Sequence, residues 1–166
     1  MSWSLSFSGR RTFRFAGPLP FVIILRMKLS IKKLHPDAKL PSYAHVSDAG
    51  MDFFTLEEVT ILPGERVAIK TGIAMAIPDG FVGLFWDKSG VAVKRGLKTM
   101  AGVIDAGYRG EVLIGLHNLG HEPQVFKAGE KIAQMLIQAV EHPELIEVDD
   151  LDETARGKGG FGSTGG

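Results

Sequence analysis

Short apolar segments separated by Gly- and Pro-containing turns are the feature that most restricts what this chain can fold into. The 166 residues include 21 Gly and 8 Pro, and many of the glycines fall between apolar runs too short for a long helix. Short apolar runs bounded by turn residues are typical of β-strands. The pattern therefore predicts an all-β chain with many turns.

About ten short strands are expected, at the spacing typical of a sandwich or barrel. A chain of this length fits one domain with its own core. Residues 91–93 are expected to open a short helix, which would place Ser89 near its N-terminus. The expected strands are residues 28–34, 51–54, 59–62, 66–70, 73–77, 81–86, 125–126, 131–137 and 145–148, with two more around residues 100–116.

Composition excludes several classes of function. The chain has no Cys, which rules out disulfides, thiolate metal sites and thiol nucleophiles. Its 19 basic and 19 acidic residues balance, so no overall charge draws it to nucleic acid or to a membrane surface. The longest apolar run, residues 21–25, is far below the roughly 18 residues of a transmembrane helix. The five histidines lack the spacing of metal ligands. We expect no nucleic-acid or membrane partner.

The first 26 residues differ from the rest of the chain. They carry four Arg and no acid, and without them 15 basic and 19 acidic residues remain from Met27 onward. A basic, Ser-containing, acid-free leader resembles a transit peptide in outline. The interpretation we favour is that Met27 is the true start and that residues 1–26 are disordered, processed or not made. Residues 27–150 are then expected to form the β-domain.

Residues 151–166 are predicted to form a flexible, Gly-rich C-terminal arm. The segment 157–162 matches G-x-G-x-x-G by letter, but only four residues follow it, so it cannot open the helix of a dinucleotide site. Glycine amides can still approach phosphate oxygens, and an aromatic ring suits a stacked base. The alternative is a solubilising tail. The other donors are Arg156, Ser163 and Thr164, and the ring is that of Phe161.

A Gly-bounded turn at residues 102–111 gathers a carboxylate (Asp105), a phenol (Tyr108) and a guanidinium (Arg109). Apolar segments precede and follow the turn, so we predict a β-hairpin with these groups at its tip. Taken singly, each has an ordinary alternative: an acid that bonds its own loop, a core ring and a surface ion pair.

Three further polar positions stand out. Lys88, Ser89 and Gly90 form a second cluster of hydrogen-bond donors, although most such triplets are ordinary turns. Gln134 interrupts an apolar strand, and a buried amide must join a core network or face a pocket. Asp52 lies between Met51 and Phe53 and raises the same question, with a turn acid as the alternative.

In chain order, five segments resemble the five motifs of the trimeric dUTP diphosphatase (dUTPase) family. The resemblance covers residues 27–166. The second motif usually reads Pro-Arg-Ser-Gly, whereas here Asp87 and Lys88 replace its first two residues, and Lys lacks the planar fork of Arg. The leader has no counterpart in the family pattern. The segments are residues 49–52 (Ala-Gly-Met-Asp), 88–92 (Lys-Ser-Gly-Val-Ala), 102–110 (Gly-Val-Ile-Asp-Ala-Gly-Tyr-Arg-Gly), 128–134 (Ala-Gly-Glu-Lys-Ile-Ala-Gln) and 156–165.

The resemblance implies a jelly-roll-like β-domain and a homotrimer whose active sites each combine more than one chain. It implies hydrolysis of dUTP to dUMP and pyrophosphate with Mg²⁺, which removes dUTP and supplies dUMP for dTMP synthesis. Asp105 would orient and deprotonate the water that attacks the α-phosphorus. A cytoplasmic enzyme is expected, with organellar targeting by residues 1–26 the less favoured alternative.

The resemblance also assigns the remaining site residues. Tyr108 would lie beneath the deoxyribose and exclude a 2′-hydroxyl, while the backbone at Val103 and Ile104 would pair with uracil. Asp52 would meet Mg²⁺ through water. The arm would close over a neighbouring chain's site. Ser89, Gly90 and Gln134 would hold the phosphates, and Lys88 and Thr99 are assigned to the substrate. The substrate-binding residues of the arm are Arg156 on the terminal phosphate, Phe161 stacked on uracil, and Gly162, Ser163 and Thr164.

Two other functions stay open from the sequence. The first is dCTP deamination on the same fold, alone or coupled to dUTP hydrolysis; residues 102–111 and the fifth motif argue against it. The second is a non-catalytic nucleotide-binding module. Asp105 argues against that function, because binding alone does not need a positioned base.

Overall fold

The computed structural model describes residues 27–160, and every structural statement below refers to them. The predicted leader (residues 1–26) lies outside this range. So do the predicted arm residues Phe161, Gly162, Ser163 and Thr164.

Strands dominate the described residues, as the sequence predicts, and the expected segments between residues 28 and 137 form strands within a few residues of their predicted bounds. The one helix in the described range is η1, five residues of π-helix, and Ser89 directly precedes it as predicted. No helix in this range is long and apolar enough to cross a membrane. The elements are β1 (Ser30–Lys33), β2 (Met51–Phe54), β3 (Val59–Ile61), β4 (Arg66–Lys70), β5 (Ile73–Ala76), β6 (Phe81–Trp86), η1 (Gly90–Lys94), β7 (Leu97–Met100), β8 (Val103–Ile104), β9 (Leu113–Asn118), β10 (Gln124–Phe126) and β11 (Lys131–Ala139).

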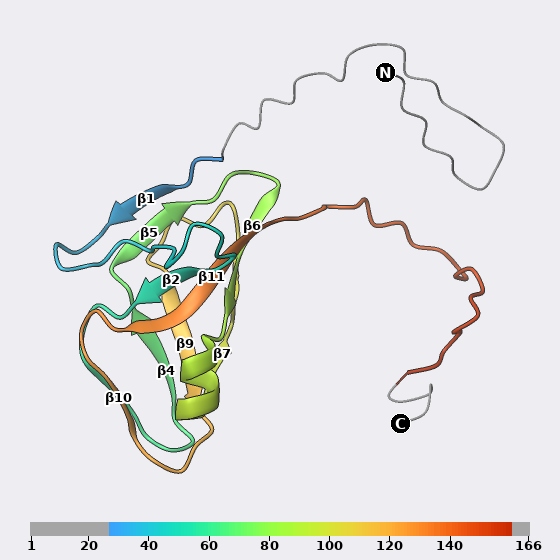
Figure 1. The fold of residues 1–166 in the computed structure, drawn as a ribbon. Coiled ribbons are helices and arrows are strands. Elements are labelled where there is room, and N and C mark those ends of the chain that lie inside the picture. The colour runs from blue at the N-terminus through green and yellow to red at the C-terminus, as the bar shows by residue number, and fades with distance from the viewer. Residues whose placement is uncertain (1–26, 161–166) are drawn as a thin grey trace, which may run out of the picture.

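The strands pair into two larger sheets and two small ones, and all of the pairs are antiparallel. One larger sheet has the order β2-β11-β6-β8 and the other the order β4-β9-β7, while β1 pairs with β5 and β10 with β3. Strand β11 lies between β2 and β6 (Figure 1). Most neighbours in these sheets are distant in sequence, so the fold depends on long-range pairing.

The core forms where inward-facing side chains of these sheets meet. Strand β9 alternates in burial, with Ile114 and Leu116 buried between more exposed neighbours. The rings of Phe53 and Phe85 meet edge to face, with their centroids 4.8 Å apart. The largest fully buried side chains include Phe53, Phe126, Ile61, Ile73, Ile77, Leu97, Ile132 and Met135.

The predicted hairpin around residues 102–111 is wrong in its pairing. Strand β9 pairs with β7, whereas β8 pairs with β6 in the other sheet. The chain changes sheets at Ala101, which has a φ of 50°, and at Gly102, whose carbonyl accepts the Phe85 amide at 2.7 Å. A Cβ at residue 102 would lie 2.9 Å from the Phe85 carbonyl oxygen, so glycine permits this approach.

The predicted last strand at residues 145–148 is absent, because that segment has no strand partner within the described chain. The side chains of Leu145 and Ile146 are 92% and 74% exposed. Residues 140–160 run away from the β-domain as an extension (Figure 1). The apolar residues of this segment suit a strand, but a strand forms only with a neighbour that takes its hydrogen bonds.

Candidate active site

The carboxylate of Asp52 is the centre of a charged cluster on strand β2. Its side chain is buried, and each oxygen contacts one ammonium: Lys88 Nζ lies 2.6 Å from Oδ1, and Lys131 Nζ lies 2.6 Å from Oδ2. Burial alone raises the pKa of this carboxyl, but the two ammonium groups together hold it below its ordinary value. One carboxylate and two ammoniums leave a net positive charge, which favours an anionic ligand.

Gln134 lies beside this carboxylate. It faces Asp52 across the β2–β11 pair and Trp86 across the β11–β6 pair. Its Nε2 donates to the main-chain oxygen of Asp87 at 2.8 Å. A Cβ at Gly50 would lie 2.5 Å from Gln134 Oε1, so glycine is required there for the amide to fit. We name the group Asp52, Lys88, Lys131 and Gln134 the Asp52 cluster.

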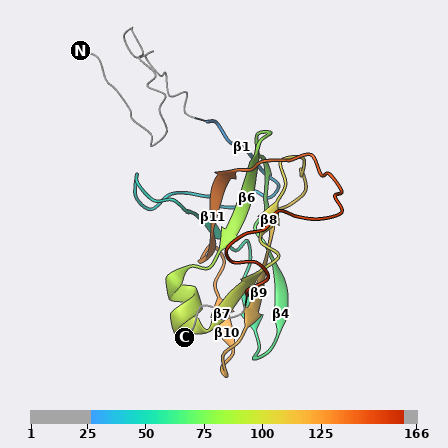
Figure 2. The same ribbon diagram turned by 90° about the vertical axis from the view of Figure 1, so that its right-hand side faces the viewer.

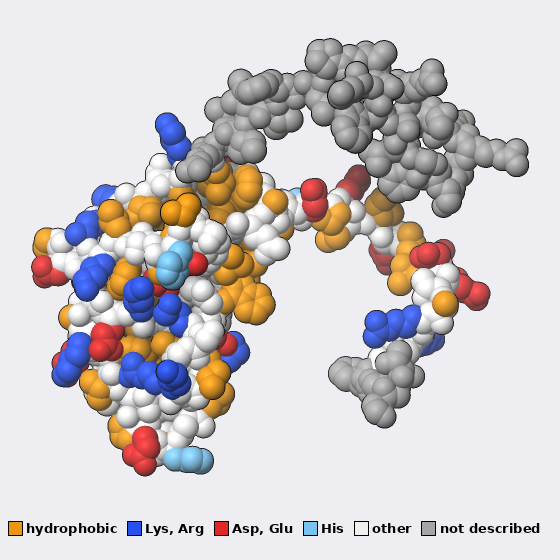
Figure 3. Space-filling view, in the orientation of Figure 1, with side chains coloured by type: hydrophobic (Ala, Val, Ile, Leu, Met, Phe, Trp, Pro, Cys, Tyr) orange, Lys and Arg blue, Asp and Glu red, His pale blue; other side chains and the backbone are white. Residues whose placement is uncertain are grey.

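Ser89 and Gly90 follow Lys88 at the start of η1. The Ser89 hydroxyl makes no capping bond to the helix, and both residues are exposed. A Cβ at Gly90 would meet no atom of the chain within 4 Å. Nothing in the described residues therefore requires glycine at position 90 on steric grounds. Lys and Arg side chains gather in the region of β2 and β11 (Figure 3).

Thr99 lies on β7, beside the same turn. Its amide and its hydroxyl both donate to Asp87 Oδ1, at 2.7 and 2.6 Å, and Lys98 Nζ lies 2.8 Å from Oδ2. Burial raises the pKa of Asp87, but these three donors lower it by more than burial raises it. The pKa therefore lies below its ordinary value. The proton of the Thr99 hydroxyl is thus already donated to a side chain.

Residues 102–111, which we name the Asp105 loop, have a different environment. Asp105 and Arg109 are exposed, and the Tyr108 amide donates to the Asp105 carbonyl at 3.1 Å to close the turn. The Tyr108 hydroxyl donates to the Glu111 carbonyl at 2.9 Å, which fixes the ring. Arg109 Nη1 donates to the carbonyls of Ala106 and Tyr108, so this guanidinium braces its own loop.

The two groups lie toward opposite ends of strand β6. Ile104 pairs with Gly83 and Val103 with Leu84, so the antiparallel β8 carries Asp105 toward the start of β6. Lys88 and Ser89 follow the end of β6. At about 3.3 Å per residue, this places Asp105 roughly 20 Å from the Lys88 turn. One copy of the chain does not bring its own Asp105 to its own Asp52 cluster.

Strand β8 is the edge of its sheet, with β6 as its one partner there (Figure 2). An edge strand leaves N–H and C=O groups on its outer side without partners in the sheet. The outer side of Val103 and Ile104 therefore offers donors and acceptors to a planar polar group.

Of the predicted arm, the described range includes Arg156. Its Nε donates to the Gly159 carbonyl at 2.9 Å within a turn, and its side chain is exposed. This places Arg156 on the extension, apart from both groups. Phe161, Gly162, Ser163 and Thr164 lie outside the described residues, so their predicted roles stay predictions.

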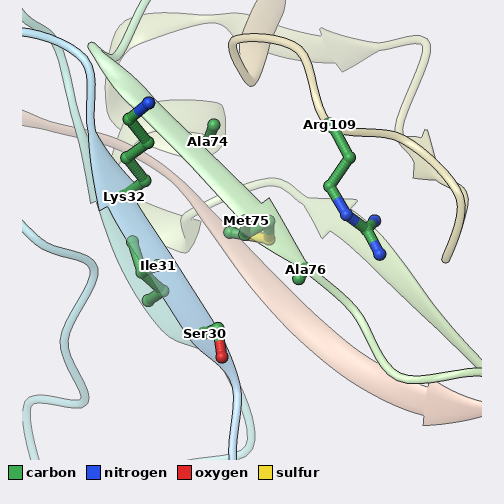
Figure 4. A pocket seen from close by; sticks show the side chains of 7 residues that line it. All are labelled: Ser30, Ile31, Lys32, Ala74, Met75, Ala76 and Arg109. Atoms are coloured by element: carbon green, nitrogen blue, oxygen red, sulfur yellow. The ribbon is translucent and has the colours of Figure 1, made fainter.

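A cavity of about 340 Å³ lies elsewhere, between the β1–β5 pair and the Asp105 loop (Figure 4). Arg109 is its only lining residue from that loop, and none of its lining residues belongs to the Asp52 cluster. Two short strands supply the rest of its wall: Ser30, Ile31, Lys32, Ala74, Met75 and Ala76. This cavity has no carboxylate in its lining and shares no residue with the Asp52 cluster, so the candidate site lies with the two groups above.

The donor set limits how Mg²⁺ can bind here. The described residues contain no group of three or more His, Asp or Glu side chains arranged to hold a metal ion. Each oxygen of Asp52 is bonded to an ammonium and retains further lone-pair capacity. This set fits an ion that is held mainly by phosphate oxygens and water, as Mg²⁺ often is, with Asp52 bonded to one of the waters.

Lys131 is a site residue that the sequence analysis missed. It opens β11, and a register shift between Lys131 and Ala133 accompanies its position opposite Phe54. A strand-initial lysine is usually a solvated end residue, and its contact with Asp52 depends on pairing between segments almost 80 residues apart. The one sequence signal for this contact was the acid Asp52 in the predicted strand 51–54, which needs a basic partner if it is buried.

The comparisons with known proteins agree on one family. The family model described as dUTPase matches residues 36–165. A deoxyuridine 5'-triphosphate nucleotidohydrolase of Thermobifida fusca is 47% identical over 143 residues, covering 84% of this chain and 80% of the relative. The protein of that name from Mycobacterium leprae is 48% identical over 146 residues, covering 83% and 95%.

Solved structures agree with the sequence relatives. The Staphylococcus bacteriophage 80alpha dUTPase with dUpNHpp superposes with a TM-score of 0.79 at 35% identity, covering 83% of this chain and 98% of that one. A mutant dUTPase from phage phi11 of S. aureus, whose structure describes the coordination of a structural Mg(II) ion, has a TM-score of 0.71 at 31% identity, covering 75% and 98%. The antiparallel sheets form the jelly-roll-like domain that the resemblance implies. On these grounds, the chain belongs to the dUTPase family.

Proposed function

We infer that this chain is a dUTP diphosphatase, which hydrolyses dUTP to dUMP and pyrophosphate. The observation that carries this function is the presence of two complementary open sites in a chain of this family. The cationic Asp52 cluster suits a triphosphate, and the Asp105 loop suits a nucleoside next to a carboxylate. Relatives at 47–48% identity bear the name deoxyuridine 5'-triphosphate nucleotidohydrolase.

The phosphates bind at the Asp52 cluster and the start of η1. The net positive charge of Asp52, Lys88 and Lys131 attracts the polyanion, and the Ser89 hydroxyl is free to donate. The open space at Gly90 lets a phosphate oxygen approach the backbone. The Asp87 carbonyl accepts the Gln134 amide and so holds this side chain beside the phosphate site. Thr99 is a predicted substrate residue, but its hydroxyl proton is donated to Asp87 and a phosphate oxygen has no proton to give, so it does not suit a direct phosphate contact.

The base and the sugar bind at β8 and the Asp105 loop. The outer edge of Val103 and Ile104 supplies backbone groups that pair with uracil in the manner of an added strand. The ring of Tyr108, fixed by its bond to Glu111, lies beneath the deoxyribose and leaves no space for a 2′-hydroxyl. Rigid backbone groups exclude bases whose exocyclic groups differ, because mismatched polar groups would stay unpaired.

Asp105 acts as the general base. Its exposed carboxylate accepts a proton from a water placed for attack on the α-phosphorus, and the P–O bond to the β-phosphate breaks to release pyrophosphate. An exposed carboxylate is a weak base at neutral pH, so most of the rate enhancement comes from positioning and from charge stabilisation by the donors around the phosphates.

Mg²⁺ accompanies the triphosphate and neutralises part of its charge when bound. Asp52 would hold the ion through a water, and Lys88 and Lys131 keep its carboxylate ionised and in place. The cluster is cationic before the nucleotide binds. The free cluster would therefore repel a cation that comes without the nucleotide.

The active site combines copies of the chain in a homotrimer. Support comes from the separation of the Asp105 loop and the Asp52 cluster along β6, which requires that one copy supply the base and another the phosphate contacts. The extension at residues 140–160 leaves its own domain and carries Arg156 and the arm toward a neighbour, over whose site Phe161 stacks on uracil. The enzyme acts in the cytoplasm.

Pyrophosphate release from a panel of dUTP, dCTP, dTTP and UTP tests this function. We expect release from dUTP alone, with at least a hundredfold preference over each of the others, since each differs at a group that the site excludes. Conversion of dCTP to dUTP or dUMP would establish the deaminase instead. Tight dUTP binding without any release would establish a non-catalytic module.

A further inference from the structure

Asp87 is the residue through which the parts of the phosphate site are connected. It lies between β6 and η1, one residue before Lys88. Its carboxylate accepts three donors from β7, and its carbonyl accepts the amide of Gln134 from β11. Strands β7 and β11 belong to different sheets, so one residue links the two larger sheets at the edge of the site.

Hydrogen bonds hold both the side chain and the carbonyl of Asp87. Oδ1 is shared by the amide and hydroxyl of Thr99, and Oδ2 is paired with the ammonium of Lys98. Such charge-assisted bonds are stronger than neutral ones. With its side chain half-buried and its carbonyl bonded to Gln134, the peptide that leads into Lys88 has one favoured orientation.

That orientation determines where the phosphate ligands point. Lys88, Ser89 and Gly90 follow directly, and Ser89 has no bond to the helix that would fix its hydroxyl. Gln134 donates to the Asp87 carbonyl, and the lack of a side chain at Gly50 leaves room for its amide. A change in the peptide at residue 87 would therefore misplace two ligands together.

We propose that Asp87 is a positioning residue for triphosphate recognition, acting through the turn at Lys88–Gly90 and through Gln134 without touching the substrate. The proposal deepens the inferred dUTP diphosphatase function and rests on it. Both carboxylate oxygens are engaged by β7, so the residue contributes through geometry. Base and sugar recognition is assigned to the edge of β8 and the Asp105 loop, whose side-chain hydrogen bonds do not involve Asp87.

The test compares Asp87→Ala with Asp87→Asn. The alanine variant removes every side-chain bond to β7, whereas the asparagine variant keeps an oxygen for both Thr99 donors and loses the Lys98 ion pair. Glu65→Ala is the matched control, because the Glu65 carboxylate also accepts a backbone amide, that of Leu62, at a distant turn. For each variant one measures kcat and KM for dUTP, the Kd of the dUTP analogue dUpNHpp, the Kd of deoxyuridine, the Tm and the oligomeric state.

We expect Asp87→Ala to raise KM for dUTP and the Kd of dUpNHpp about ten- to a hundredfold, since misplacing several charge-assisted donors costs this much. The Kd of deoxyuridine should change less than twofold. Asp87→Asn should retain most of the affinity, within about fivefold of the unmodified chain, because both Thr99 bonds persist. Glu65→Ala should match the unmodified chain in all nucleotide constants.

Equal weakening of dUpNHpp and deoxyuridine, together with a lower Tm, would make Asp87 a general structural residue and overturn the proposal. Unchanged dUpNHpp affinity in Asp87→Ala would also overturn it. If the alanine variant does not fold, the asparagine variant decides: a loss beyond tenfold, or a loss shared with deoxyuridine, contradicts the Thr99-mediated role. Because analogue binding needs no turnover, absence of dUTP hydrolysis by the unmodified chain would refute the proposed function separately.

Discussion

The Asp52 cluster and the Asp105 loop differ in how they are held. In the cluster, a buried carboxylate is paired with two ammoniums, and Gln134 donates to the main chain of Asp87 from another segment. In the loop, Asp105, Tyr108 and Arg109 are exposed, and Tyr108 and Arg109 donate to carbonyls within the same ten residues. The cluster is built by the sheet, whereas the loop is built locally on its edge.

This difference indicates which functions each region can perform unaided. The cluster has its donors in place before any ligand binds, so it suits binding of a flexible polyanion. The loop holds its carboxylate in the open, where a water can reach it but where nothing within the same copy completes the site. Under the proposed function a second copy supplies what the loop lacks, and mixed oligomers test that division.

The largest effect should come from removing the base. Asp105→Asn keeps the size of the side chain but cannot accept a proton from water, so kcat for dUTP should fall at least a hundredfold. Because Asp105 does not hold the phosphates, the Kd of dUpNHpp should stay within about tenfold. Equal losses in rate and affinity would show that Asp105 shapes the loop rather than catalyses.

Mixed oligomers test whether the two regions cooperate between copies. Asp105→Asn lacks the base, and Gly90→Asp places a negative charge in the open space where a phosphate would bind. If each site combines two copies of a cyclic trimer, equal mixing after dissociation should restore about a quarter of wild-type activity, since one site in four pairs intact halves. No recovery in confirmed mixed trimers would contradict a shared site.

A smaller substitution at Gly90, beside the Asp52 cluster, separates an effect on binding from an effect on folding. Gly90→Ala meets no atom of the chain, and alanine is better than glycine in a helical position by about 0.5–1 kcal/mol. The free energy of unfolding should therefore stay constant or rise, while KM for dUTP should increase about tenfold because the methyl group occupies the approach to the backbone. Chemical unfolding and steady-state kinetics measure the two quantities, and unaltered kinetics would remove Gly90 from the site.

Acid should weaken the cluster side of the molecule first. Asp52 and Asp87 both have a pKa below the ordinary 3.8, so as the pH falls the unfolded chain binds protons before the folded one. The stability they contribute is complete above about pH 5 and is lost as the pH falls through their folded pKa values. Thermal unfolding between pH 7 and pH 3 should show a smaller decline in Asp87→Asn than in the unmodified chain. Asp79→Asn, at an exposed turn, is the control and should decline like the unmodified chain.

The smallest effect is expected for the binding of Mg²⁺ to the chain without nucleotide. Because the cluster is cationic, Mg²⁺ added without nucleotide should give no measurable binding at millimolar concentration, whereas Mg²⁺ should tighten the binding of dUpNHpp. Titration calorimetry with and without the analogue measures both. Strong binding of Mg²⁺ to the free chain would mean that Asp52 releases a lysine to become a direct ligand.

Local structure was well predicted by the sequence, because each strand depends on its own residues and turns. Segments 51–54, 66–70 and 81–86 match β2, β4 and β6 in their bounds. Pairing was predicted less well. The hairpin prediction joined β8 to β9, yet a left-handed Ala101 and a close approach at Gly102 direct β8 into the other sheet. A positive φ at alanine is a tertiary outcome that residue preferences argue against.

For the candidate site, too, residues in local motifs were predicted and contacts that depend on strand pairing were not. Lys88, Ser89, Gln134 and Asp52 were predicted from their motifs, and the structure brings them together. Lys131 was missed, because its contact depends on the register of β11 against β2. The role of Asp87 was equally hidden, since its three donors come from β7, more than ten residues further along the chain.

The shortness of β8 has a consequence for solubility. A strand edge with free amides and carbonyls can recruit another chain and begin aggregation, and proteins commonly protect such edges by keeping them short. Strand β8 has two residues, and the chain turns away at Ala101 before it and at the Asp105 turn after it. Two residues of backbone are enough to pair with one flat ring of a nucleobase and too few to template a growing fibril. The chain can therefore keep a strand edge without a partner and avoid the aggregation that a longer edge would promote.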